Sequence, residues 1–128
     1  MKWVKPEIKH LELTKWKWLV SYPENLKLGH KVDIGAFTYI MARFGVVIED
    51  FVQIGSHVSI YSLSTIDDKK GKVIIKRNAR VGSHSIIMPG VEIGENSVIG
   101  AQSFVPAYTK ISKNEVWAGV PVRKLKKF

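Results

Sequence analysis

A six-residue repeat constrains the fold of this chain more than any other feature. Written in sixes, residues 81–104 read VGSHSI, IMPGVE, IGENSV and IGAQSF. An aliphatic residue opens each unit, and a small residue or valine stands four places later. A fixed period of six is typical of a parallel β-helix, in which each unit forms a short strand and a tight corner. The aliphatic side chains then point inward, and the corners take small or turn-adapted residues.

The same phase extends upstream with two interruptions. Units open at Leu28, Ile34 and Ile40, and three more units follow over residues 48–65, after a shift of two at Val46 and Val47. Residues 66–74, IDDKKGKVI, do not fit the phase. They form either one repeat with a three-residue insertion or a loop that leaves the coil, and their glycine and charged residues favour an exposed loop.

Three units make one triangular coil, so positions 18 apart stack, with neighbouring coils about 4.8 Å apart. Most parallel crossovers are right-handed, but this pattern resembles the known left-handed exception. We therefore predict an all-β fold, a left-handed parallel β-helix over residues 28–110 with a loop at 66–74. Residues 1–27 form an N-terminal cap, in which Trp3, Trp16 and Trp18 cover the open end of the coil. Residues 111–128 form a basic C-terminal tail.

The composition narrows the possible partners. The 128 residues suit one domain, and the absence of cysteine rules out disulfides and thiolate chemistry. No apolar run is long enough to span a membrane, and no signal-peptide core is present, so we expect a cytoplasmic protein without membrane insertion. The net charge of +9 indicates an anionic partner. No nucleic-acid recognition helix is visible, so the phosphates of a small cofactor fit better, and a solvated basic surface is the alternative.

Two segments resemble the left-handed β-helix hexapeptide acyltransferases. They are VGSHSIIMPGVEIGENSVIGAQSFV and the tail WAGVPVRKLKK, and the resemblance covers residues 28–128. The nearest likeness is to galactoside and maltose O-acetyltransferases and to nucleotide-sugar N-acetyltransferases. The resemblance implies a homotrimer with active sites between adjacent subunits. It also implies that acetyl-CoA lies along the outside of the coils, with its pantetheine arm parallel to the solenoid axis.

The resemblance carries the cofactor contacts to particular residues. Ser83 and Ala101 match the small residues whose backbone holds the pantetheine arm, and we expect Ser62 to join their stack. A large side chain would block the arm there, although corners prefer small residues in any case. Arg123 matches the basic residue that reaches the CoA phosphates, with Lys124 assisting. Arginine suits phosphate because its planar fork donates two hydrogen bonds.

The match fails at the catalytic residues of the O-acetyltransferases. Their histidine lies in the loop after the repeat IYSLST, whereas this chain has no histidine in SLSTIDDKKG, and Thr65 falls nearest. Met41 lies nearest the place of their substrate-binding asparagine. We therefore take His57 first and His84 second as candidate general bases.

Two charged residues are candidates for binding the acceptor. Arg43 would approach a phosphate of the acceptor, and Asp67, with Asp68, would hold an imidazolium or an acceptor amine. Plain solvated surface is the alternative for both of these residues and for the histidines.

We predict an acetyl-CoA-dependent acetyltransferase that acts on a sugar in surface glycan synthesis. A nucleotide-linked amino sugar is favoured over a sugar hydroxyl, because an amine attacks a thioester without prior deprotonation. A γ-class carbonic anhydrase needs three histidines that converge on a metal. His30, His57 and His84 are spaced 27 apart, which is not a multiple of 18 and indicates that they lie out of register. No metal is therefore expected. A non-catalytic scaffold is also less favoured, since it needs neither the small-residue stack nor the AGVP tail.

Overall fold

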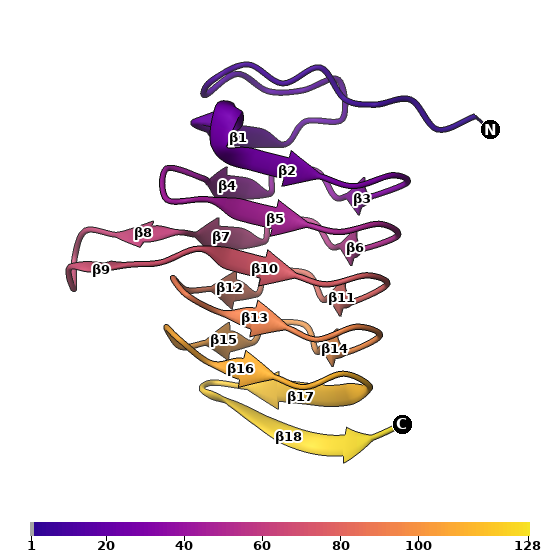
Figure 1. The fold of residues 1–128 in the computed structure, drawn as a ribbon, viewed down its shortest axis with the longest axis vertical. Coiled ribbons are helices and arrows are strands. Elements are labelled where there is room, and N and C mark those ends of the chain that lie inside the picture. The colour runs from indigo at the N-terminus through magenta and orange to yellow at the C-terminus, as the bar shows by residue number, and fades with distance from the viewer. Residues whose placement is uncertain (1) are drawn as a thin grey trace.

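The computed structural model describes residues 2–128, and the chain winds into a three-sided β-solenoid (Figure 1). Each turn contributes one short strand to each of three sheets, A, B and C. Sheet A contains β1 (Leu19–Ser21), β4 (Tyr39–Met41), β7 (Ser59–Tyr61), β12 (Ile86–Ile87) and β15 (Phe104–Val105). Sheet B contains β2 (Leu26–Leu28), β5 (Val46–Ile48), β10 (Val73–Ile75), β13 (Glu92–Ile93) and β16 (Lys110–Ile111). Sheet C contains β3 (Asp33–Ile34), β6 (Gln53–Ile54), β11 (Arg80–Val81), β14 (Val98–Ile99), β17 (Glu115–Gly119) and β18 (Val122–Lys127).

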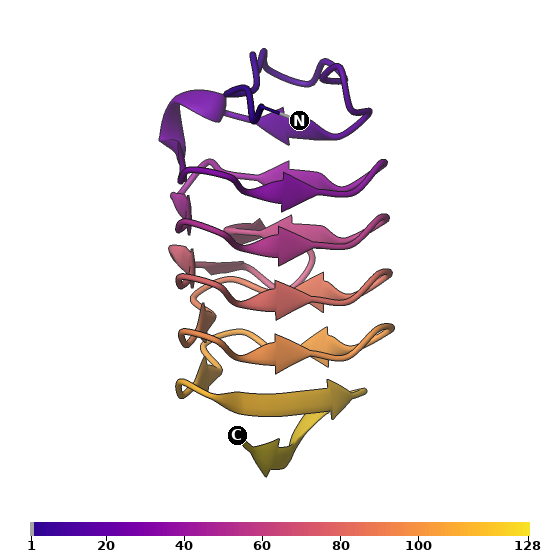
Figure 2. The ribbon, with the colours of Figure 1, turned by 90° about the vertical axis from the view of Figure 1, so that its right-hand side faces the viewer.

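The solenoid is left-handed. The near strands of sheet B run to the right in Figure 1, and the far strands of sheet A run to the left, while the chain descends from its N-terminal end. The view turned by 90° shows the coils as successive layers along one axis (Figure 2). Strands pair in parallel between layers, except that β18 runs antiparallel to β17. The predicted all-β, left-handed parallel β-helix is thus confirmed.

The aliphatic residues that open the hexapeptide units line the interior. In sheet A, Ile40, Ile60 and Ile87 lie directly above one another and have no exposed surface. The small residue four places into a unit is buried as well. The Ser85 hydroxyl, for example, donates to the carbonyl oxygen of Gly100 in the next coil at 3.1 Å. Buried polar groups are normally hydrogen-bonded in this way, and here the hydroxyls also join adjacent coils.

The corner between sheets B and C carries a ladder of asparagines. Asn78, Asn96 and Asn114 have left-handed backbone conformations, with φ values of 60°, 61° and 63°. The side-chain amide of Asn78 donates to that of Asn96 at 2.8 Å, and Asn96 donates to Asn114 at 3.1 Å. Asparagine tolerates this conformation better than most residues, which explains its recurrence at this corner.

A β-hairpin leaves the coil between sheets A and B. Its strands are β8 (Leu63–Ser64) and β9 (Lys69–Lys70), and it projects from the left edge of the coils in Figure 1. The chain rejoins sheet B at Val73, so the last residues of the predicted 66–74 loop belong to β10. Ile87 pairs with Ile60, which is 27 positions earlier instead of 18, so the excursion adds nine residues to this coil.

The coils extend further toward both ends than predicted. β1 and β2 already pair with the second coil, so regular pairing begins at Leu19 and not at residue 28; the 3-10 turn η1 (Pro23–Asn25) joins them. Trp18 is buried in the cap, and the indole of Trp3 donates to Val32, whereas Trp16 remains 41% exposed. Within the predicted basic tail, β17 and β18 pair with each other and continue sheet C. Within residues 2–128, no helix is long and apolar enough to cross a membrane.

Candidate functional site

A column of small residues runs along the corner between sheets C and A. We call Ala36, Ser56, Ser83 and Ala101 the small-residue track. The carbonyl oxygens of Ser56 and Ser83 connect successive coils: the amide of His84 donates to the former at 3.0 Å, and the amide of Gln102 donates to the latter at 2.9 Å. The register of β14 and β17 continues the column to Ala118 and Gly119 at the C-terminal end.

The glycine before each track residue lets the coils approach closely. A Cβ atom on Gly82 would lie 2.4 Å from the backbone nitrogen of Ala101, and one on Gly35 would lie 2.4 Å from that of Ser56. No real Cβ atom fits at that distance, so only glycine allows this spacing. The recurring pair of glycine followed by serine or alanine therefore builds a corner without bulky side chains.

Ser62 does not belong to this track. Its side chain is buried after β7, at the corner between sheets A and B, where it donates to Met41 at 2.6 Å and accepts from the amide of Phe44 at 3.0 Å. Ser56 takes the stacked position instead, because the nine added residues of the hairpin shift the spacing from 18 to 27. The expectation for Ser62 was wrong for this reason, whereas Ser83 and Ala101 do stack.

His57 and His84 form an exposed pair beside the track. Their rings stack with centroids 4.6 Å apart and planes 5° apart. The earlier inference that a spacing of 27 puts them out of register was therefore wrong, again because of the nine added residues. His30 lies at a different corner, where its ring packs against Trp3. Among residues 2–128, no three histidine or acidic side chains gather as metal ligands would.

The β18 strand places Arg123 near the C-terminal end of the track. Arg123 pairs with Ala118, and its side chain is exposed. The neighbouring Lys124 has a structural partner, because its Nζ lies 2.8 Å from the carboxylate of Glu115. That carboxylate, which is 7% exposed, also accepts hydrogen bonds from the indole of Trp117 and the amide of Ser112, both at 3.1 Å. The hydrogen bonds from Lys124 and Trp117 lower the pKa of Glu115.

Arg43 and Asp67 lie at the opposite edge of sheet A from the histidines. The Arg43 guanidinium lies 5.5 Å from the centre of the Phe44 ring, at the corner between sheets A and B. Asp67 lies in the hairpin that starts at this corner, and the hydrogen bond from Ser64 lowers its pKa, with a smaller effect from Lys69. Strand β7 separates this edge from His57, so one chain does not bring the two groups together.

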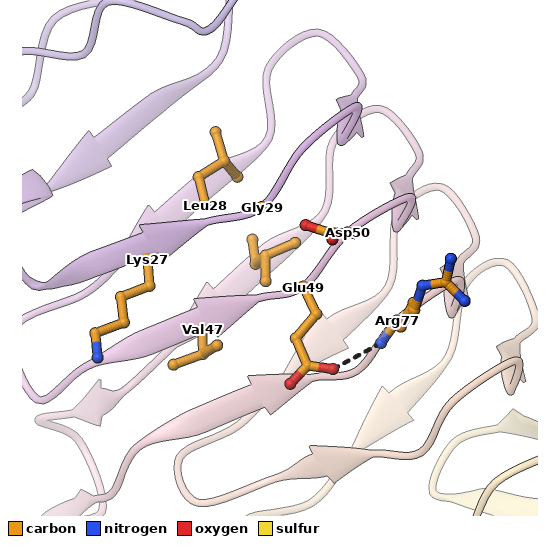
Figure 3. A pocket seen from close by; sticks show the side chains of 8 residues that line it. Lys27, Leu28, Gly29, Val47, Glu49, Asp50 and Arg77 are labelled. Atoms are coloured by element: carbon orange, nitrogen blue, oxygen red, sulfur yellow. Dashed lines mark hydrogen bonds between the residues drawn. The ribbon is translucent and has the colours of Figure 1, made fainter.

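A shallow hollow at the start of the corner between sheets B and C was not predicted (Figure 3). Lys27 and Arg77 lie beside it together with Glu49 and Asp50. The two carboxylates are already engaged, since Glu49 accepts from the amide of Arg77 at 2.9 Å and Asp50 accepts from that of His30 at 2.8 Å. These contacts join the turns of adjacent coils, and the hollow lies on a different corner from the track.

The sequence and fold were compared with known proteins. Residues 72–107 match the family described as bacterial transferase hexapeptide (six repeats). The galactoside O-acetyltransferase of Escherichia coli K12 is 36% identical over 123 residues, which cover 84% of this chain and 59% of that protein. The chain thus spans less than two thirds of this relative.

Two solved structures share the fold. A galactoside acetyltransferase in complex with coenzyme A has a TM-score of 0.76 and 31% identity, covering 86% of this chain and 58% of that chain. The N-acyltransferase AntD from Bacillus cereus, in complex with dTDP and 3-hydroxybutyryl-CoA, has a TM-score of 0.66 and 29% identity. That match covers 90% of this chain and 78% of the other. Both an O-acetyltransferase and an N-acyltransferase are therefore similar to this chain.

Proposed function

We propose that this chain, a left-handed β-helix protein whose hexapeptide repeats are similar to those of the acyltransferases just described, transfers an acetyl group from acetyl-CoA to a sugar. The observation that carries the proposal is the small-residue track, which ends beside an exposed arginine. A corner lined by small side chains suits a long, thin polar ligand, and the cation beside its end suits a phosphate.

In this proposal acetyl-CoA lies along the track. Its phosphates point toward Arg123, and its thioester points toward the N-terminal coils. Ser83 and Ala101 hold the pantetheine arm, with Ser56 extending the contact by one coil. Arg123 is the main phosphate contact. Lys124 contributes less than predicted, because its ammonium group neutralises the buried Glu115.

The acceptor is a sugar, and we favour a nucleotide-linked amino sugar in surface glycan synthesis. The likeness to AntD, whose structure holds dTDP, supports a nucleotide-linked acceptor. The likeness to galactoside O-acetyltransferase supports the alternative, a sugar hydroxyl. Arg43 and Asp67 suit the phosphate and the amine of the favoured acceptor, but they lie away from the histidines of the same chain. We therefore propose a homotrimer, in which this edge of one subunit faces the track of the next.

The transfer requires that the acceptor be placed next to the thioester and that one group accept a proton. The acceptor nitrogen or oxygen attacks the thioester carbonyl, the new C–N or C–O bond forms, and the C–S bond breaks. His57 takes the proton that the acceptor loses and returns it to the departing thiolate, which leaves as the CoA thiol. Holding the two reactants side by side supplies much of the rate enhancement, and a backbone N–H aimed at the thioester oxygen stabilises the developing negative charge.

Thiol release from acetyl-CoA, measured across nucleotide-linked amino sugars and free sugars, tests this function. We expect release with at least one acceptor and none without an acceptor. Release with amino sugars alone would indicate N-acylation, and release with hydroxyl acceptors alone would indicate O-acylation. No release with any acceptor, despite measurable CoA binding, would contradict the proposed transfer to a sugar.

A further inference from the structure

The His57 imidazole is held between two other rings. The ring of His84 stacks on one face, at 4.6 Å between centroids. The ring of Phe37 lies 5.3 Å away, tilted by 45°. The three side chains occupy equivalent positions on consecutive coils, since each follows a track residue and each has a left-handed φ of 56° to 65°. The next position in this column is Gln102, which has no ring, so only His57 has a ring neighbour on each side along the column.

This arrangement differs from the usual way of orienting a catalytic histidine. A histidine base is normally fixed by a carboxylate or carbonyl that accepts a hydrogen bond from its second ring nitrogen. Within residues 2–128, neither His57 nor His84 makes a side-chain hydrogen bond to another residue, and both side chains are exposed. A parallel stack occupies one face of the ring and makes no use of its nitrogens, and the His57 side chain is exposed.

We propose that Phe37 and His84 are positioning residues that fix the orientation of the His57 ring by stacking, in place of a hydrogen-bonded carboxylate. This inference rests on the proposed function, in which His57 accepts the proton of the acceptor. The two histidines then have different roles. His57 accepts the proton through a ring nitrogen, and His84 stacks its ring on that of His57.

The exposure of the Phe37 ring supports a role for its side chain. Phe37 has the left-handed φ common to these corners, 65°, as do Phe51 and Tyr108 at other corners, and its side chain is 56% exposed. Glycine or asparagine would fit this corner with less strain and would expose less apolar surface. Because Phe37 adds nothing to the buried core, its contact with the His57 ring is the interaction that accounts for an aromatic side chain at this exposed corner.

Replacing each ring separately tests the division of roles. The variants are His57→Phe, His84→Ala and His84→Phe, and the measurements are kcat and KM for the acceptor, together with binding of CoA. We expect His57→Phe to lower kcat by about a hundredfold or more, the usual size of a general-base contribution. We expect His84→Ala to lower kcat by roughly tenfold, the scale of an aromatic stacking contact. CoA affinity should change little in all three variants.

His84→Phe gives the decisive comparison, because it keeps a flat ring but removes both nitrogens. It should recover most of the turnover that His84→Ala loses and keep the pH dependence of kcat seen in the wild type. Phe37→Leu should lower kcat about as much as His84→Ala does. Phe37→Tyr keeps a ring at this position, so its kcat should stay near that of the wild type. Melting temperatures identify any variant whose loss comes from misfolding.

Three results would overturn the inference. If His84→Phe is as inactive as His57→Phe, His84 acts through its nitrogens. If His84→Ala keeps full turnover, stacking has no role. If His57→Phe keeps full turnover while the wild type transfers acetyl groups, His57 is not the base, but the proposed transferase function stands. That function fails separately, when the wild type releases no thiol with any acceptor.

Discussion

Filling the small-residue track should weaken the binding of CoA strongly. The chain should stay folded. Ala101 is exposed, so a larger side chain at this position projects outward and leaves the buried core unchanged. Neighbouring coils are about 4.8 Å apart, so an indole at Ala101 would cover the path of the pantetheine arm over more than one coil. If it displaces roughly nine non-hydrogen atoms of the ligand, at about 0.3 kcal/mol each, the loss is about 2.7 kcal/mol. This corresponds to about a hundredfold weaker binding.

The chain offers a matched control for Ala101→Trp. Glu95 precedes Asn96 at the corner between sheets B and C, just as Ala101 precedes Gln102, and both of the following residues have left-handed φ values. Glu95→Trp therefore adds the same bulk at the same place in a turn, but on a different corner. Calorimetric titration with CoA should show weak or no binding to Ala101→Trp and near-normal binding to Glu95→Trp. Equal affinity in the two variants, with unchanged melting temperatures, would refute the placement of CoA on the track.

Three further predictions concern stability. Because the folded-state pKa of Glu115 is lowered, its contribution is complete above the ordinary glutamate pKa of about 4.3 and is lost as the pH falls through the lowered value. Lys124→Met should flatten this acid limb in a plot of melting temperature against pH, and an unchanged limb would argue against the ion pair. Ile75→Ala, at a fully buried position, should cost about 2–5 kcal/mol in chemical denaturation. Ile66→Ala, in the hairpin and 99% exposed, should stay within about 0.5 kcal/mol of the wild type. Asn96→Ala should cost about 2–3 kcal/mol, since it loses two amide hydrogen bonds and resists the left-handed φ, whereas Asn96→Gly should cost only about 1 kcal/mol. Equal losses of stability in the two Asn96 variants would show that the left-handed φ does not contribute to the difference.

The repeat predicted the fold because its signal is local and recurs in successive coils. The interior positions of sheet A follow directly from the aliphatic residues that open each unit. The ends were harder to predict, because β1, β2 and β18 pair with the coils through backbone hydrogen bonds and without the hexapeptide pattern. Such pairing joins residues that are far apart in the sequence, so a short stretch of sequence does not predict it.

The stacking of the candidate residues was predicted only in part, because their register depends on the length of one excursion. Ser83 and Ala101 lie within an uninterrupted run and were placed together correctly. Ser56 and His57 lie on the other side of the hairpin, and a spacing rule of 18 puts them in the wrong place. A signal was present, because the tripeptide Gly-Ser-His occurs at both 55–57 and 82–84. Aligning these copies gives the nine-residue insertion and the stack of His57 on His84.

The partner of Lys124 could not be predicted. Its ion pair with Glu115 forms only because β18 folds back antiparallel on β17. The basic tail therefore contains two kinds of cation, a structural one at Lys124 and an exposed one at Arg123. Sequence alone does not distinguish them, since both follow the same AGVP segment.

The most direct test of the account is to follow the acetyl group itself. The wild-type protein would be incubated with acetyl-CoA that carries an isotopic label in its acetyl group, together with nucleotide-linked amino sugars or free sugars, and the products identified by mass spectrometry. We expect the label to move to the sugar and free CoA to appear in equal amount. Label that stays on CoA with every acceptor, or that appears only as free acetate, would contradict it.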